Sequence, residues 1–218
     1  MNDPEMQQFY QSLSKLDREA VDALNSPLKI QEFLDHTEYS SENTNRCPLE
    51  VFRDRIAHCL DGALFGAAML RLLNRQPLII DLLPEPGTDD DHVLAIFKEN
   101  NLFGAVAKSN FTGLRYREPI YKTSRELVLS YFEDFFNVGG QKTLRGYSRI
   151  IDLQAYDHFQ WMNDSAGVDK IEKRLYSLKR IPLFKVEISN SFSPVDPISY
   201  RAGMLVVNPA GLYQPNRE

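Results

Sequence analysis

Hydrophobic positions in the first 45 residues follow a loose helical spacing and are separated by polar stretches. Phe9, Leu13 and Leu16 lie three or four residues apart, which places them on one face of a helix. A Ser-Pro pair then interrupts the pattern, and a short helix is expected over 28–34 before a polar loop. The sequence therefore predicts a helical N-terminal extension over 1–45.

Two further helical stretches follow, and the second is rich in small residues. The first is expected over 48–57, and the second, over 58–74, reads HCLDGALFGAAMLRLLN. Glycine costs a helix roughly 1 kcal/mol relative to alanine, yet this stretch contains both Gly62 and Gly66. We therefore expect the helix to need the close approach of another element, with its small face packed against a sheet.

Three apolar segments after residue 76 are typical of buried strands. They are expected at 77–83, 92–97 and 102–108. The polar residues KENN between the last two make a suitable hairpin connection. The pattern therefore predicts a helix followed by antiparallel strands.

The last hundred residues carry a weaker pattern. Thr123 and Glu126 form a capping-box sequence, and an amphipathic helix is expected over 124–136 because Leu127, Tyr131 and Phe135 recur every four residues. The remaining expectations are a short strand near 150–153, helices over 155–163 and 167–179, a strand over 182–188, and a short strand over 202–207 in a tail that is otherwise mostly loop.

Composition restricts the class of protein. The 218 residues predict a single domain, and 43% hydrophobic with 25% charged residues excludes a disordered chain. A net charge of −5 argues against a broad nucleic-acid surface, so no nucleic-acid partner is expected. No apolar run approaches the ~20 residues of a membrane helix, so no membrane association is expected. The absence of a signal-like N-terminus and the presence of two cysteines favour a cytoplasmic protein with reduced thiols.

Cys59 is the candidate nucleophile, whereas Cys47 is expected to be structural. It lies at the expected start of the small-residue helix, where unpaired N–H groups and the helix dipole favour a thiolate and lower its pKa. The same N–H groups can hold an oxyanion. A single free cysteine is more often buried packing than a nucleophile, so the interpretation depends on its neighbours.

His92 is the candidate base, because it begins the second expected strand. Antiparallel pairing across the 98–101 turn brings the end of the third strand close to it, at Ser109 and Asn110. Asn110 is the favoured residue to orient the imidazole, as in Cys-His-Asn proteases, and Ser109 is the alternative. Asp91 is expected to point to the opposite side of the strand from His92.

The ordered set over 46–111 resembles the core of the transglutaminase-like (papain-like) superfamily. The matching pieces are a cysteine before small residues, a helix that ends in MLRLL, a proline, a histidine that begins a strand, and the strand after it. The family usually completes its triad with aspartate, and this sequence offers Ser109 or Asn110 instead. The resemblance implies an α+β fold in which the nucleophile helix packs on an antiparallel sheet, with additional N- and C-terminal helices. It covers under a third of the chain, and 112–218 is expected to be a helical and irregular elaboration.

The resemblance also implies a cysteine-dependent hydrolase or acyltransferase that acts on an amide of a peptide or protein. Cys59 would form a thioester, with His92 as base and acid, and no cofactor would be needed. Candidate substrate contacts are His58, Arg55 and Asp91. The sequence does not decide between hydrolysis and transamidation, and it predicts no oligomeric state.

Three alternatives remain open at this point. The first is a catalytically inactive protein that uses this fold as a protein-interaction module. The absence of an aspartate at the third position of the triad is consistent with it. The second is a redox-sensing thiol at Cys59, which would not need His92. The third, a metal site at 89–92, has no second ligand cluster to support it, so an acidic solvated turn is expected there.

Overall fold

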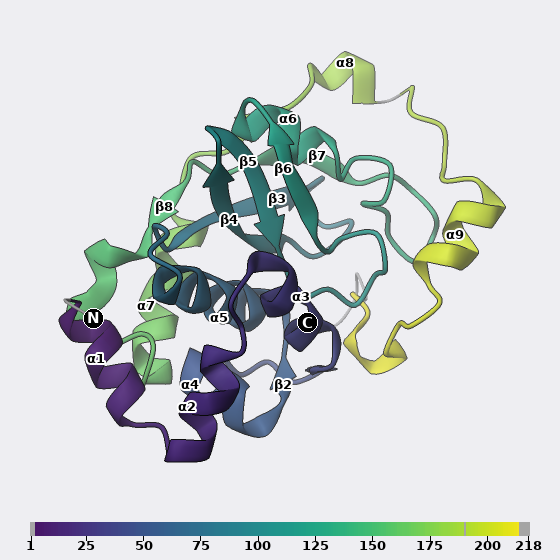
Figure 1. Ribbon diagram of the computed structural model, residues 1–218. Coiled ribbons are helices and arrows are strands. Elements are labelled where there is room, and N and C mark those ends of the chain that lie inside the picture. Colours follow the sequence, from purple (N-terminus) through teal and green to yellow (C-terminus); the bar gives the residue numbers. More distant parts are fainter. Residues whose placement is uncertain (1–2, 190, 214–218) are drawn as a thin grey trace.

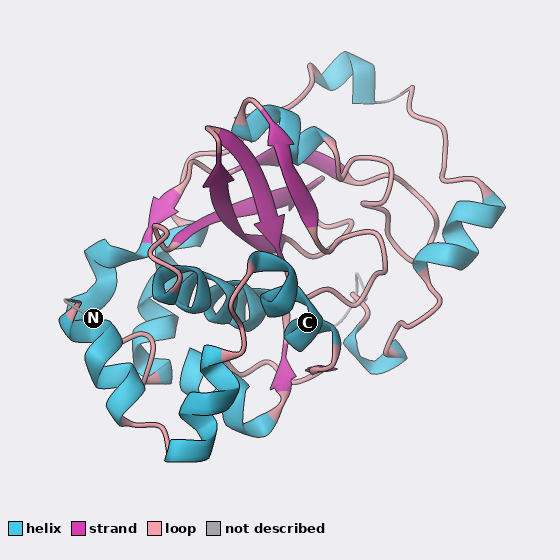
Figure 2. Cartoon of the chain, in the orientation of Figure 1, coloured by secondary structure: helices cyan, strands magenta, loops and turns pink. Residues whose placement is uncertain are grey.

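The structure is a computed structural model that describes residues 3–189 and 191–213. Within this part of the chain, an antiparallel seven-stranded sheet forms the middle layer, in the order β6-β5-β4-β3-β7-β9 with β8 also pairing with β3 (Figures 1 and 2). The strands of the sheet are β3 (Leu78–Pro84), β4 (His92–Glu99), β5 (Leu102–Val106), β6 (Arg117–Tyr121), β7 (Leu144–Tyr147), β8 (Ile151–Asp152) and β9 (Ile181–Pro182). A separate parallel pair joins β1 (Glu38–Tyr39) to β2 (Ile56–Ala57).

Helix α5 (Cys59–Leu72) packs directly on one face of this sheet (Figure 1). Its two glycines allow the close contact: a Cβ atom at Gly62 would meet the Lys108 Cβ at 2.2 Å, and one at Gly66 would meet the Val106 Cγ2 at 2.8 Å. Gly66 faces β4 and β5 and Gly62 faces the segment just after β5, so the close packing of the helix offsets the conformational entropy lost at glycine. The expected small-residue contact with a sheet is confirmed.

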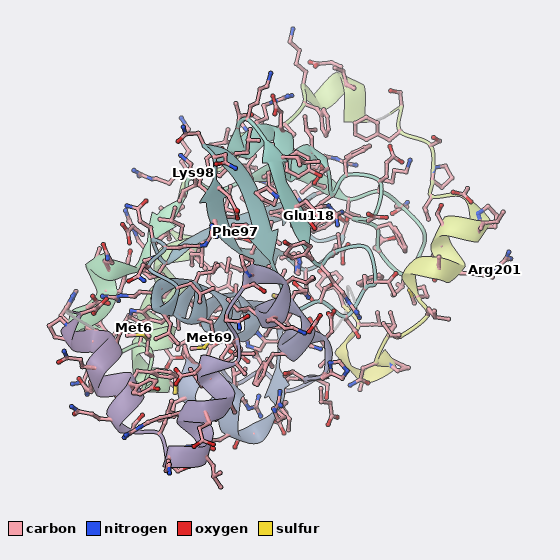
Figure 3. The ribbon with its side chains drawn as sticks, viewed as in Figure 1. Met6, Met69, Phe97, Lys98, Glu118 and Arg201 are labelled. Atoms are coloured by element: carbon pink, nitrogen blue, oxygen red, sulfur yellow. The ribbon has the colours of Figure 1, made fainter. Side chains whose placement is uncertain are left out.

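The remaining helices on this side bury α5 and complete the larger core. They are α1 (Pro4–Gln11), α2 (Lys15–Asp22), α3 (Pro27–Asp35), α4 (Pro48–Asp54) and α7 (Ser165–Tyr176). Figure 3 shows Met6 and Met69 among these packed helices, and both side chains are buried. No helix in the described part of the chain has the length and apolar character needed to cross a membrane.

A second core covers the other face of the sheet. Alternate residues of β4, Leu94 and Ile96, point into it, and they meet buried side chains of α6 (Ser124–Leu129) and the turns after it. The intervening residues Val93 and Ala95 belong to the core around α5. This alternation follows from the two-residue period of a strand, and it decides which face each β4 side chain occupies.

The observed fold class agrees with the one predicted from the sequence, but several predicted element boundaries differ from the observed ones. The α+β architecture, with a nucleophile-position helix on an antiparallel sheet and extra helices from both ends, is confirmed. The helix expected over 124–136 ends at Leu129 and continues as turns. The strand expected over 182–188 is only the two residues of β9, followed by a short helix, α8 (Val186–Ser189).

Two more expectations in the last hundred residues are wrong. The segment 202–207 is not a strand, because it forms the end of α9 (Pro197–Gly203) and a turn. The helix expected over 155–163 is instead a 3-10 helix, η1 (Leu153–Phe159). The chain then returns through η2 (Pro209–Gly211) toward β1, where Asn208 donates from its Nδ2 to the Tyr39 carbonyl at 3.1 Å (Figure 1).

Candidate functional site

Cys59 is the first residue of α5, and the segment before it fixes that position. Helix α4 ends at Asp54 and is capped by Arg55, whose backbone is left-handed (φ 57°), and β2 then leads into α5. His58 occupies the cap position, where its amide donates to the Asp61 carboxylate at 3.2 Å. The Cys59 Sγ lies 3.8 Å from the Asp91 carbonyl oxygen. The expected place of the cysteine at a helix N-terminus is confirmed.

The surroundings of Cys59 favour the thiol over the thiolate. Burial raises the pKa of the Cys59 thiol well above its ordinary value, and the carboxylate of Asp91 raises it further. The backbone amide of Val93 lowers this pKa, but it does not overcome the burial. The direction is opposite to the one expected for a cysteine at a helix N-terminus, so Cys59 is a neutral S–H group near pH 7.

His92 lies on the other side of the sheet from this thiol. Because side chains alternate along a strand, His92 lies on the same face of the sheet as Leu94 and Ile96. Its Nε2 atom is 2.8 Å from the Leu114 carbonyl oxygen. Because a carbonyl only accepts, Nε2 carries the proton. Burial lowers the pKa of the imidazole to about 4, so the ring is neutral near pH 7. The predicted Cys59–His92 pairing is not assembled in this structure.

The two residues accordingly line two different cavities. Cys59 lines a cavity of about 280 Å³, which we call the cysteine cavity, and His92 lines a smaller one of about 40 Å³. Tyr39 and Asp91 border both. Since Asp91 precedes His92 in the chain, its side chain takes the face toward the thiol that the prediction gave to the histidine.

Asn110 holds a different segment from the one expected. Its Nδ2 donates to the carbonyls of Asn208 at 2.9 Å and Gly211 at 3.2 Å, and its Oδ1 accepts from the Asn208 amide at 2.7 Å. Residues 208–212, which we call the C-terminal strap, are thereby fixed beside the cysteine cavity. Ser109 is also engaged locally, because its Oγ accepts from the Phe111 amide at 3.0 Å. His92 is oriented by the Leu114 carbonyl rather than by either predicted residue.

His58 does line the cysteine cavity, as expected of a substrate contact. Its Nε2 is 3.4 Å from the Oδ1 of Asp61, a fully buried carboxylate at the start of α5. Burial lowers the pKa of His58 to about 4, and burial raises the pKa of Asp61 to about 7. This neighbouring pair was missed in the sequence, although an acidic residue three positions after a helix cap is a recognisable capping-box signal.

Of the other two predicted substrate contacts, only Asp91 borders the cysteine cavity. Arg55 is not on the cavity wall; its guanidinium carbon lies 3.8 Å from the centre of the Phe33 ring, a cation–π contact at the protein surface. Asp91 does border the cavity. Burial raises its pKa to about 6, and the nearby carboxylate of Asp90 adds to the rise.

Several cavity residues carried no signal in the sequence. Glu172 and Tyr176 come from α7, more than 110 residues after Cys59, and Tyr39 comes from the two-residue strand β1. Asp81 does not border the cavity itself but pairs with Val93, which does; it lies inside β3, in a stretch that is otherwise apolar. Only the charge of that residue within a buried strand marks it out, because an unpaired buried carboxylate is unusual.

The donor arrangement does not suit a metal ion. Across the described residues, no group of three or more His, Cys, Asp or Glu side chains is placed so that it could hold one. The turn at 89–91 instead anchors neighbouring structure: the Asp89 carboxylate accepts from the Thr143 hydroxyl at 2.7 Å. The acidic turn therefore has a structural role at Asp89.

Comparison with known proteins gives loose structural overlaps, two of which are with structures of the same protein. No protein-family model matches the chain, and no curated protein matches it. A structure of LapG from Legionella pneumophila is 16% identical over 48% of this chain and 71% of its own, with a TM-score of 0.35. A structure of EGTA-treated LapG from the same organism is 16% identical over 78% of this chain and 96% of its own, with a TM-score of 0.40. Overlap at this level carries no argument about the family or the activity of this chain.

Proposed function

We propose that this chain is a binding protein, in which the cysteine cavity receives part of a peptide or protein partner without acyl transfer. The observation that supports the proposal is the placement of Cys59 and His92 on opposite faces of the sheet. A thioester mechanism needs the base within about 3 Å of the nucleophile, directly or through one water. A partly buried thiol with a raised pKa and no facing imidazole lacks that activation.

The proposal is tested by the pH dependence of iodoacetamide alkylation at Cys59. A Cys47→Ala background leaves Cys59 as the single thiol, and the same chain in urea gives the unfolded reference near ~8.5. We expect slow native alkylation with a midpoint above that reference, unchanged by His92→Ala. A midpoint below the reference that rises in His92→Ala would restore a thiolate–imidazole pair and reject the proposal.

The second candidate is a cysteine hydrolase or acyltransferase with Cys59 as nucleophile and His92 as base. It is favoured by one observation, the position of Cys59 as the first residue of a 14-residue helix and on a cavity wall. For this candidate, the His92 ring would have to exchange faces with Asp91, which amounts to a one-residue shift of β4. Mass spectrometry after incubation with activated amide and ester probes tests it. An acyl adduct on Cys59 that disappears in His92→Ala supports the enzyme, whereas no adduct supports the binding protein.

A further inference from the structure

We propose that the cysteine cavity binds an organic cation, a primary ammonium or guanidinium group, between the carboxylates of Asp91 and Asp81. The inference rests on the binding role proposed above and names the chemistry of the bound group. It comes from the charges around the cavity, from one buried carboxylate without a partner, and from the aromatic side chains beside them.

Most acidic side chains on the walls of the cavity lack a matching cation; the exception is Glu42, which forms an ion pair with Arg46. Asp90, Asp91 and Glu172 all border it, and none of the described residues on its wall is lysine or arginine. Among the described residues, none of these three carboxylates takes part in an ion pair. Glu172 is held only by neutral donors, since its two oxygens accept from Asn45 at 3.0 Å and Tyr176 at 3.5 Å. The site therefore has an excess of negative charge.

Asp81 supplies the independent observation. Only 1% of this residue is exposed, and its Oδ1 has no hydrogen-bond partner. Asp81 lies directly across the β3–β4 pair from Val93, which borders the cysteine cavity. Side chains of directly paired residues share one face of a sheet, so the Asp81 carboxylate lies on the cavity side, beside Val93.

A buried carboxylate without a partner is costly, and a ligand that donates hydrogen bonds removes the cost. Burial raises the pKa of Asp81 well above its ordinary value; among the described residues, Arg180 is the one basic side chain whose charge lowers this pKa, and the two side chains form no ion pair. The Arg180 guanidinium donates to the carbonyl of Pro84 instead. Asp81 does not itself border the cavity but lies beside Val93, which does, so a cation that enters beside Val93 would supply the missing donor and favour the ionised carboxylate.

The shape and the aromatic side chains favour an organic cation. Tyr39 and Tyr176 both border the cavity, and an aromatic ring attracts a cation within about 6 Å of its centre. The volume of about 280 Å³ lies just below the roughly 300–1,000 Å³ of pockets for drug-sized ligands, so it suits a small amine or a single basic side chain. The donor arrangement described above does not favour a metal ion.

Isothermal titration calorimetry of the full chain at pH 8 tests the inference. The probes are agmatine and spermidine as free cations, and blocked tripeptides with a central arginine or lysine. A tripeptide with central norleucine is the neutral control. Heat with either cationic set, and none with norleucine, supports the inference, and the set with the higher affinity identifies the source of the cation. No heat with any cation up to millimolar concentration overturns it.

Three variants locate the binding. Asp91→Asn and Asp81→Asn should each weaken binding about tenfold or more, because charge-assisted hydrogen bonds are lost. Glu19→Gln, which removes an exposed acid on α2, should leave the affinity unchanged. Affinity that is equal in all three variants overturns the inference. If Asp81→Asn does not fold, Asp91→Asn carries the test.

Different results would reject the cation site and the non-catalytic binding role. If cations bind and Asp91→Asn weakens them, the cation site stands whatever the alkylation profile of Cys59 shows. A low, His92-dependent midpoint for that thiol would reject the non-catalytic role and leave the cation site in place. Loss of the calorimetric signal alone would reject the cation site and leave the binding role.

Discussion

The side chain of Asn110 donates to the carbonyl of Gly211 across 101 residues of sequence, at 3.2 Å. Through this bond and its two bonds to Asn208, Asn110 attaches the C-terminal strap to the end of the central hairpin. Gly211 also borders the cysteine cavity, and a Cβ atom there would lie 2.9 Å from the Tyr39 ring. The strap is thus one wall of the cavity, and it is fixed by a residue expected to serve catalysis.

Removal of this attachment should expose the cysteine. Asn110→Ala deletes three hydrogen bonds worth about 1 kcal/mol each, so the strap opens more often. We expect iodoacetamide to alkylate Cys59 at least about tenfold faster, since every 1.4 kcal/mol changes an equilibrium about tenfold. The matched control is Ser109→Ala, which leaves the strap bonds intact. Equal rates in both variants would mean that the strap does not limit access.

The contact between α5 and the sheet gives a stability prediction. Gly62→Ala places a methyl group where the Lys108 Cβ lies, at 2.2 Å, so the helix has to move away from β5. Overpacking of this kind typically costs about 1–3 kcal/mol, and the gain in helix propensity offsets only part of it. Urea unfolding should show a lower midpoint for Gly62→Ala. Gly139→Ala, which meets its nearest atom at 3.3 Å in an exposed turn, is the control and should change stability little.

A buried arginine connects the first helix to the 3-10 helix η1. Arg71 donates to both oxygens of Asp3 and to both oxygens of Asp157, at 2.5–3.0 Å, while its own side chain is only 7% exposed. Arg71→Met leaves both acids without their partner and should lower the free energy of unfolding by about 2 kcal/mol or more. The exposed pair of Arg75 with Glu99 is the comparison, and Arg75→Met should cost less than about 1 kcal/mol. Similar losses in calorimetric melting would contradict this ranking.

Stability should also depend on the protonation of Asp91. Burial raises its pKa to about 6 in the folded chain, against about 3.9 unfolded, so the folded state binds the extra proton between these values. Its contribution to stability is therefore present below about pH 4 and is lost as the pH rises through about 6. Asp91→Asn removes that loss and should be more stable than the wild type by about 3 kcal/mol at pH 7, with a difference under about 1 kcal/mol at pH 4.

Urea unfolding of both chains at several pH values measures this difference. The charged or titratable groups near Asp91 are Asp90, Asp81, Glu172, Cys59, Tyr39 and Tyr176, and all are common to both chains. Glu19→Gln should show no such pH-dependent gain over the wild type. A gain that is absent at pH 7, or that grows as the pH falls, would contradict the raised pKa.

The sequence predicted the central helix and hairpin because their signals are local. The apolar strands, the KENN turn and the two glycines of α5 all depend on near neighbours. The amphipathic pattern after Thr123 indicated burial correctly but not helix length: Tyr131 and Phe135 are buried, although the helix ends at Leu129. Spacing alone does not separate a continued helix from a series of turns that bury the same side chains.

The candidate site could be predicted only in part, for two physical reasons. The helix start placed Cys59 correctly, but the face taken by His92 depends on the register of β4 within the sheet. A shift of one residue would move every β4 side chain to the opposite face. Asn110 follows β5 and borders the same small cavity as His92, but its side-chain hydrogen bonds go to the distant C-terminal strap. Contacts over about a hundred residues leave no periodic signal in the sequence.

In this structure the Cys59 thiol and the His92 imidazole do not form a pair. The most direct test is a nitrogen-detected NMR titration of His92 in the wild type and in Cys59→Ser. We expect a neutral ring protonated on Nε2, with a midpoint near 4 that is the same in both chains. A midpoint above ~6.5 in the wild type that falls in Cys59→Ser would instead reveal a thiolate–imidazolium pair.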